Sequence, residues 1–231
     1  MTGKLREDLF EGTDPNVGVT AARGTTKARI ERAALKLFAC QGMDGVSIKQ
    51  IAQACEISDG AMYRHFKSKD ALARLMFEAI HARLLQLVDA NIRPDASLEE
   101  TVHAVVTAYC ELAENDPAQF TYHLTHRNYF LAASGDGGAN PSDVMSARVT
   151  AAMASGEIPA RDPELAAAMA LGLVMQPAEY RIFGRIAQPM TELIPASWPC
   201  CAPPERPAAA PFCPSFRRSS CVLSSSTSPI I

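Results

Sequence analysis

The sequence lacks the apolar runs that would place it in or across a membrane. No run of about 18 or more uncharged apolar residues is present, which argues against a membrane-spanning helix. Glu7, Asp8 and Glu11 lie where a signal peptide would have a basic segment followed by an apolar one. We therefore expect a cytoplasmic protein with no membrane partner.

The sequence also lacks the patterns of a disulfide framework, a zinc site or a catalytic site. Its seven cysteines form no Cys-x-x-Cys pair, and an odd number of cysteines is not typical of disulfide stapling. We find no Ser-His-Asp, Cys-His or paired-carboxylate constellation and no glycine-rich phosphate loop. We therefore expect a protein that is not an enzyme and that has no catalytic residue, no cofactor and no metal site.

Acidic residues outnumber basic ones, but the two kinds are unevenly distributed. The 231-residue chain has a net charge of −3, whereas residues 23 to 70 carry nine basic and five acidic side chains. Acidic residues are in excess on both sides of this segment. The distribution indicates a small polyanion-binding unit joined to a larger body with another role; chance clustering of charge is the alternative.

The sequence does contain helical periodicity, and it has no convincing strand pattern. Apolar residues at spacings of three and four predict a first helix that ends at Gly42. Ser47 and Ser58 are suitable N-caps for two short helices, and Ser68 precedes a long amphipathic one. Because the two short helices are joined by a turn of a few residues, we predict a helix-turn-helix from Ser47 to Phe66.

The second short helix is suited to entering the major groove of DNA. Gly60 and Ala61 have almost no side chain, so the start of this helix can approach base edges closely. Hydrogen-bond donors for phosphate oxygens surround it. The alternative is a helical hairpin with a solvated basic rim. The residues predicted to contact DNA are Ser47, Lys49, Ser58, Asp59, Gly60, Ala61, Tyr63, Arg64, His65, Lys67 and Lys69.

The same region resembles the N-terminal domain of the TetR family of bacterial regulators. The shared pattern consists of Ala33-Ala34, Gly42, Ile51-Ala52, Ile57-Ser58 and Tyr63-Arg64-His65-Phe66-Lys67-Ser68-Lys69-Asp70-Ala71-Leu72. The resemblance covers about residues 24 to 84. It implies that Tyr63, His65 and Lys69 contact phosphate groups, and that the residues from Ser58 to Ala61 face the bases.

Two positions depart from the family pattern. Glu56 occupies a turn position that usually holds glycine, and a left-handed backbone there costs a residue with a side chain about 1 kcal/mol. Asp59 adds a negative charge at the base-facing end of the helix. It either reads a cytosine amino group or only favours the helix N-terminus.

The remainder of the chain is predicted to be a helical body. The expected helices are Leu98 to Glu114, Pro117 to Ala132, Pro141 to Ala154 and Pro163 to about Gly184. By resemblance the body encloses a ligand pocket, and the helix from Pro117 is rich in aromatic residues; a packed core is the equal alternative. The candidate pocket residues are Tyr109, Phe120, Tyr122, His123, His126 and Tyr129.

Together these patterns predict an all-α protein, in which a three-helix head with the helix-turn-helix precedes a helical ligand-binding and dimerisation body. The expected divisions are a disordered tail (1 to 23), the TetR-type head (24 to 84), the body (85 to 188) and a disordered tail (189 to 231).

The resemblance implies a repressor that acts as a homodimer. Its expected partners are a palindromic double-stranded DNA operator and a small-molecule effector. The rival interpretation is a DNA-binding or interaction module without a ligand pocket. A closed core around Tyr122 and Tyr129 would favour this rival.

Overall fold

Short polar side chains determine where the helices begin. Ser47, Ser58, Ser68 and Ser97 each accept a hydrogen bond from the backbone N–H three residues further on. A cap of this kind contributes about 1 kcal/mol to helix stability, because it satisfies a backbone donor that has no partner within the helix. Three of the later helices also begin with proline, whose missing N–H costs nothing at a first helical position.

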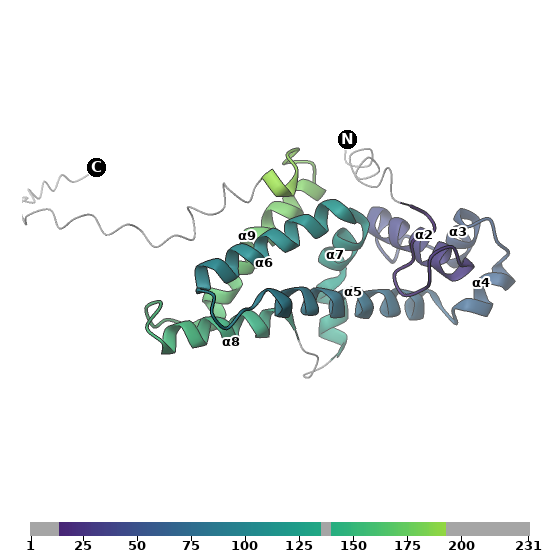
Figure 1. Cartoon of the computed structure of the whole chain (residues 1–231). Coiled ribbons are helices and arrows are strands. Elements are labelled where there is room, and N and C mark those ends of the chain that lie inside the picture. Colours follow the sequence, from purple (N-terminus) through teal and green to yellow (C-terminus); the bar gives the residue numbers. More distant parts are fainter. Residues whose placement is uncertain (1–13, 135–139, 193–231) are drawn as a thin grey trace, which may run out of the picture. The chain divides into compact units, whose positions relative to one another are not determined.

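The computed structural model describes residues 14 to 134 and 140 to 192, and these residues form helices and turns without strands. The prediction of an all-α fold is therefore confirmed. The head consists of α2 (Thr26–Gln41), α3 (Ile48–Ala54) and α4 (Asp59–His65) (Figure 1). The body consists of α5 (Lys69–Asn91), α6 (Leu98–Asn115), α7 (Pro117–Ser134), α8 (Pro141–Ala154) and α9 (Pro163–Ile182).

One apolar core continues from the head into the body. Helix α2 packs against α3 and also against α5 and α7, while α9 covers α6 and α8. The buried rings of Phe38 on α2 and Tyr122 on α7 stack with their centroids 5.9 Å apart. Figure 1 shows α5 running from the head into the body. The head is thus attached through side-chain packing as well as through the chain itself.

Residues 14 to 23 belong to the fold, which corrects the prediction of a disordered tail from 1 to 23. Val19 is buried, and the carboxylate of Glu31 on α2 accepts hydrogen bonds from the backbone N–H groups of Val19, Thr20 and Ala21 at 2.7, 2.7 and 3.0 Å. The segment is ordered without helical periodicity because the side chain of Glu31 binds its backbone. Residues 1 to 13 lie outside the described part of the chain.

The segment after α9 also differs from its prediction. Met190 is buried, and its backbone N–H donates a hydrogen bond of 2.6 Å to the carboxylate of Glu114 on α6. The disordered tail predicted from residue 189 is therefore wrong at Met190. The rest of that prediction, from residue 193 on, falls outside the described residues.

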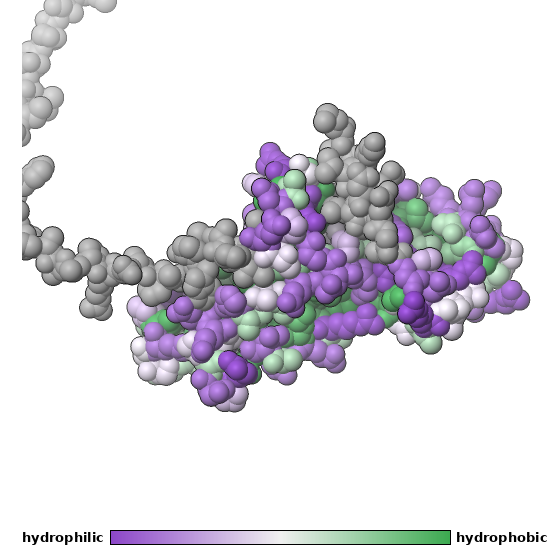
Figure 2. All heavy atoms as spheres, turned by 45° about the horizontal axis from the view of Figure 1, so that its top comes forward, coloured by the Kyte–Doolittle hydropathy of each residue, from purple (hydrophilic) through white to green (hydrophobic). Residues whose placement is uncertain are grey.

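Hydrophilic side chains predominate on the face shown in Figure 2. Among the described residues, the large apolar or aromatic side chains that are more than half exposed are Tyr63, Tyr129, Leu165, Met169 and Phe183. Among the helices of residues 14 to 192 that are described, none is long and apolar enough to cross a membrane.

Candidate nucleic-acid interface and body cavities

The turn between α3 and α4 has the geometry of a helix-turn-helix. Ser47 and Gln50 form a reciprocal capping box at the start of α3. At the other end of α3, Glu56 has a φ angle of 57°, and the N–H of Ile57 donates to the carbonyl of Ala52 at 3.0 Å. The prediction that Glu56 adopts a left-handed backbone is confirmed. This single residue turns the chain so that α4 begins at Asp59.

Helix α4 buries one side and exposes the other. Met62 is fully buried, whereas Tyr63 on the next position is 57% exposed. At Gly60 an added Cβ would meet no atom within 4 Å, so the start of α4 is open to an approaching partner. A short exposed helix with a small residue at its leading end can lie in a major groove about 12 Å wide.

The predicted DNA-contacting residues lie in α3, in α4 and in the turns beside them, up to the start of α5. Nine of them are exposed, whereas Ala61 and Lys69 are half-buried. The exposed residues are Ser47, Lys49, Ser58, Asp59, Gly60, Tyr63, Arg64, His65 and Lys67.

Lys69 has an intramolecular partner that the sequence does not reveal. Its Nζ donates a hydrogen bond of 2.8 Å to the carbonyl of Met43 in the turn between α2 and α3. Because an ammonium group has three donors, this bond leaves capacity for a phosphate contact. Lys69 therefore fixes the turn to the start of α5, in addition to the phosphate contact predicted for it.

Two cationic residues of α2 next to this site were missed. Arg29 donates to the carbonyl of Cys55 at 2.7 Å and so holds the C-terminal end of α3. The ammonium group of Lys27 lies 5.7 Å from the centre of the Phe66 ring, beside the end of α4. The positive charge of residues 23 to 70 was the only sequence signal for them, because their partners are 26 and 39 positions away along the chain.

The candidate pocket residues do not line one common cavity. Tyr122 is fully buried, with its hydroxyl group donating to the carbonyl of Ala73 at 2.8 Å. His126, one turn further along α7, has its ring Nδ1 2.9 Å from the carbonyl oxygen of Tyr122. Tyr129, in contrast, is 58% exposed. Tyr122 is thus part of a packed core, which was the alternative to a pocket at this position.

His123 lies in a stack of rings between α5 and α7. Its ring is 5.0 Å from that of Phe77, and its Nε2 is 3.1 Å from Nδ1 of His81. Burial lowers the pKa of His123 to about 3, with further lowering by His81 and Arg127. His123 is therefore neutral in the folded protein at ordinary pH.

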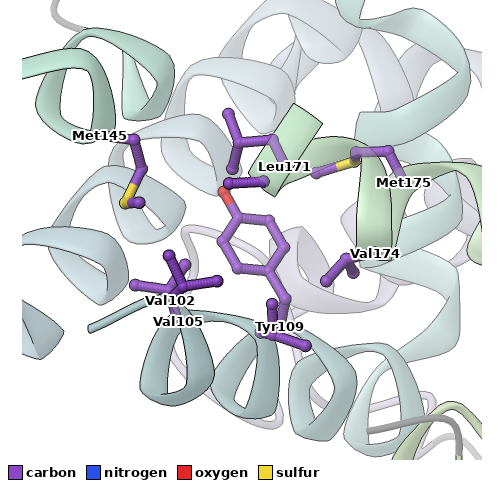
Figure 3. A pocket seen from close by; sticks show the side chains of 9 residues that line it. Val102, Val105, Tyr109, Met145, Leu171, Val174 and Met175 are labelled. Atoms are coloured by element: carbon purple, nitrogen blue, oxygen red, sulfur yellow. The ribbon is translucent and has the colours of Figure 1, made fainter. Parts of the chain in front are cut away.

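Tyr109 lines a small cavity between α6, α8 and α9. Figure 3 shows its ring reaching across the cavity, with the hydroxyl group toward Leu171. Burial raises the pKa of Tyr109 to about 12. The cavity has a volume of about 10 Å³, which is room for about one water molecule. Its lining residues are Val102, Val105, Val106, Tyr109, Met145, Ala170, Leu171, Val174 and Met175.

Phe120 lines a second small cavity, of about 20 Å³, between α6, α7 and the C-terminal part of α9. Its walls are apolar except for Thr121 and the guanidinium group of Arg181, which forms an ion pair with Glu114. Of the six candidate pocket residues, Tyr109 and Phe120 therefore line cavities, but two different ones.

Comparison with known sequences agrees with the geometry of the head. Residues 30 to 76 match the family model described as "Bacterial regulatory proteins, tetR family". The nucleoid occlusion factor SlmA of Haemophilus ducreyi is 32% identical over 77 residues, which cover 33% of this chain and 38% of SlmA. The uncharacterized HTH-type transcriptional regulator TtgW of Pseudomonas putida is 32% identical over 103 residues, which cover 44% of this chain and 74% of TtgW. The chain thus matches little more than a third of SlmA but about three quarters of TtgW.

Solved structures share the fold over head and body. FadR of Bacillus subtilis in complex with stearoyl-CoA has a TM-score of 0.57 at 18% sequence identity. The match covers 94% of the FadR chain and 74% of this chain. AibR in complex with isovaleryl coenzyme A and operator DNA has a TM-score of 0.61 at 18% sequence identity. The match covers 96% of the AibR chain and 76% of this chain. At these identities the likeness shows a common architecture.

Proposed function

The chain belongs to the TetR family of bacterial regulatory proteins, and on this premise we propose that it is a ligand-responsive repressor that binds a palindromic operator as a homodimer. That it is a DNA-binding regulator of the TetR type follows from its family. The observation that carries the proposal is the capped α3–α4 unit with an open leading end at Gly60. Operator DNA as the partner would place the protein in the cytoplasm.

The proposed contacts divide by chemistry. The leading end of α4 would face base edges. It consists of Ser58, Asp59, Gly60 and Ala61. The surrounding donors would bind phosphates and set the register without reading sequence. These donors are Ser47, Lys49, Tyr63, Arg64, His65, Lys67 and Lys69.

An exposed apolar stripe on α9 supports the homodimer. Leu165 is 60% exposed and Met169 is 65% exposed, and Tyr180 lies on the same face at helical spacing. Gly172 lies within this stripe, with no atom within 4 Å of an added Cβ. Exposed apolar side chains gathered on one helix are typical of an interface, and a two-fold axis through such a face gives a closed dimer.

The lining of the cavity at Tyr109 suits an apolar effector, but the cavity is too small to hold one without rearrangement. Its lining consists of aliphatic and methionine side chains and one phenol. The related folds in complex with stearoyl-CoA and isovaleryl coenzyme A suggest an acyl chain as the occupant. We propose that such a chain would enter by displacing Met145 and Met175, because methionine side chains repack at low cost.

The test is a fluorescence-anisotropy titration of the full chain with DNA from upstream of its own gene, beside a shuffled duplex and at two salt concentrations. Selective binding that weakens with salt supports the operator proposal. Equal binding to both duplexes contradicts selective recognition of this DNA.

The small cavities favour a second candidate, a DNA-binding regulator that has no effector. Acyl-CoA thioesters of several chain lengths, added to the protein–DNA complex, separate the two. Release of DNA by a thioester but not by free coenzyme A supports the effector. Release by none of them, together with an unchanged melting temperature, favours the second candidate.

A further inference from the structure

A buried ion pair connects the head to the body. The guanidinium group of Arg32 on α2 donates to both carboxylate oxygens of Asp116, each at 2.9 Å. Asp116 lies at the corner between α6 and α7, and 84 positions separate the two residues. The side chain of Arg32 is 3% exposed and that of Asp116 is 17% exposed. A bidentate pair of this kind has a fixed relative orientation, because both hydrogen bonds lie in one plane.

The pair is the centre of a continuous polar network. Asp116 also accepts hydrogen bonds from the backbone N–H and the side-chain amide of Gln119. The amide oxygen of Gln119 accepts a bond of 3.0 Å from Arg83 on α5, and Arg83 donates to the carbonyl of Val19. The Nε of Arg32 donates to the carbonyl of Val17 at 2.7 Å. The network therefore joins α2, α5, the α6–α7 corner and the segment before α2.

The network and the apolar contacts restrain the head differently. The stacked rings of Phe38 and Tyr122 hold α2 against α7, but apolar contacts are non-directional and permit small rotations. The Arg32–Asp116 pair does not permit them without leaving buried charged groups unpaired, which is strongly unfavourable. The polar network thus adds a directional restraint to the angle of the head on the body.

We propose that Arg32 and Asp116 are positioning residues that fix the head on the body and thereby select the spacing between the two operator half-sites. The inference rests on the proposed function, since it requires two heads in one dimer. A dimer with rigid heads accepts one spacing only, because each additional base pair turns one half-site by about 34° relative to the other. Heads released from this restraint would accept several spacings.

The test compares duplexes that differ only in half-site spacing. The full-length protein first selects its preferred duplex from a pool of randomised palindromes. Affinities are then measured for this duplex and for versions with one base pair inserted or removed between the half-sites. The variants are Asp116→Asn and Arg32→Lys. Asp14→Asn is the matched control, because Asp14 forms an ion pair with Arg23 at 2.6 Å within the segment before α2.

The expected result is that Asp116→Asn and Arg32→Lys reduce the preference for the selected spacing by about fivefold or more. Asp14→Asn should keep the preference of the wild type. Folded, dimeric variants with unchanged preference overturn the proposal, as does a wild-type protein that binds its duplex but accepts all spacings equally. If the wild type selects no duplex at all, the proposed function itself fails.

A measurement on the wild type alone covers the case that neither variant folds. Operator binding should slow amide hydrogen exchange in the first turns of α7, because Asp116 transmits the restraint from α2 to this corner. Slowed exchange confined to the head would overturn the proposal.

Discussion

Single side chains hold the head in shape by binding main-chain carbonyl groups. Arg29 binds the carbonyl of Cys55, and Lys69 binds that of Met43. A buried carbonyl group without a partner costs about 1 to 3 kcal/mol, so each of these bonds stabilises one conformation of its turn. The basic residues of the head therefore have two roles: some are predicted to bind phosphates, and others fix the helices that present them.

Lys67 allows the phosphate role to be measured by itself. It is exposed and lies two residues after the end of α4. We expect Lys67→Ala to weaken binding to all DNA sequences by a similar factor. It should also reduce the slope of log affinity against log salt by about 0.9, because one phosphate contact is lost.

The matched comparison for Lys67 is Ser58→Ala. This change removes the cap and a predicted base-facing group without removing charge. Its salt slope should equal that of the wild type, and a wild-type slope in Lys67→Ala would contradict the predicted phosphate contact.

Glu56 provides a test of backbone strain. Its φ angle of 57° is unfavourable for a residue with a Cβ, and glycine adopts it without cost. We expect Glu56→Gly to raise the free energy of unfolding by about 0.5 kcal/mol, since relief of strain exceeds the added chain entropy of glycine. Urea unfolding measures the change. Gln53→Gly, at an exposed helical position three residues earlier, should instead destabilise by about 1 kcal/mol.

At the scale of elements, the contact between α5 and α7 consists largely of rings. Phe77 on α5 stacks on His123 and Phe130 of α7 at centroid distances of 5.0 and 4.7 Å. His81 and His123 share a hydrogen bond inside this contact. The neutral form of His123 is the one that fits here, because a charged imidazole would be buried beside Arg127.

This contact predicts a loss of stability in acid. The pKa of His123 is lowered to about 3 in the folded protein, against 6.5 for the unperturbed side chain. Its contribution is therefore complete above pH 6.5 and is lost as the pH falls toward 3, because the unfolded chain binds the additional proton. The resulting slope is at most about 1.4 kcal/mol per pH unit.

The variant His123→Phe, which cannot take up this proton, should show a shallower decline between these pH values in urea unfolding. His65→Gln is the control, because His65 is exposed on α4. Equal pH slopes for the wild type and His123→Phe would contradict the prediction that protonation of His123 causes the loss of stability in acid.

At the scale of the whole molecule, the proposed function depends on a second copy of the chain. The head offers one α4, and a palindromic operator requires two of them at a fixed separation. The exposed stripe around Met169 is the surface proposed to bring the two copies together.

We expect Met169→Arg to shift the protein toward the monomer in analytical ultracentrifugation and to weaken operator binding, because it places a charge in the proposed apolar interface. Ala90→Arg, which adds the same charge at an exposed position of α5, is the control. If Met169→Arg stays as dimeric as the control, another surface forms the dimer.

The sequence predicted local features well, because they depend on neighbouring residues. The caps at Ser47, Ser58 and Ser68 lie where they were expected, and Glu56 has its predicted backbone. The exposure of most predicted DNA-contacting residues follows from the same periodicity. Amphipathic spacing and capping act over three or four residues and can be read from one sequence.

The features that were not predicted depend on groups far apart in the chain. The order of residues 14 to 23 depends on the carboxylate of Glu31, and the attachment of the head depends on Arg32 meeting Asp116. The aromatic residues of α7 matched a pocket or a core equally well in the sequence. Only tertiary packing decided that Tyr122 is buried with a carbonyl partner while Tyr109 lines a cavity. The helices and the helix-turn-helix motif thus follow from the sequence alone. Which buried polar groups pair follows only from the tertiary structure, because that pairing depends on distances set by the packed helices.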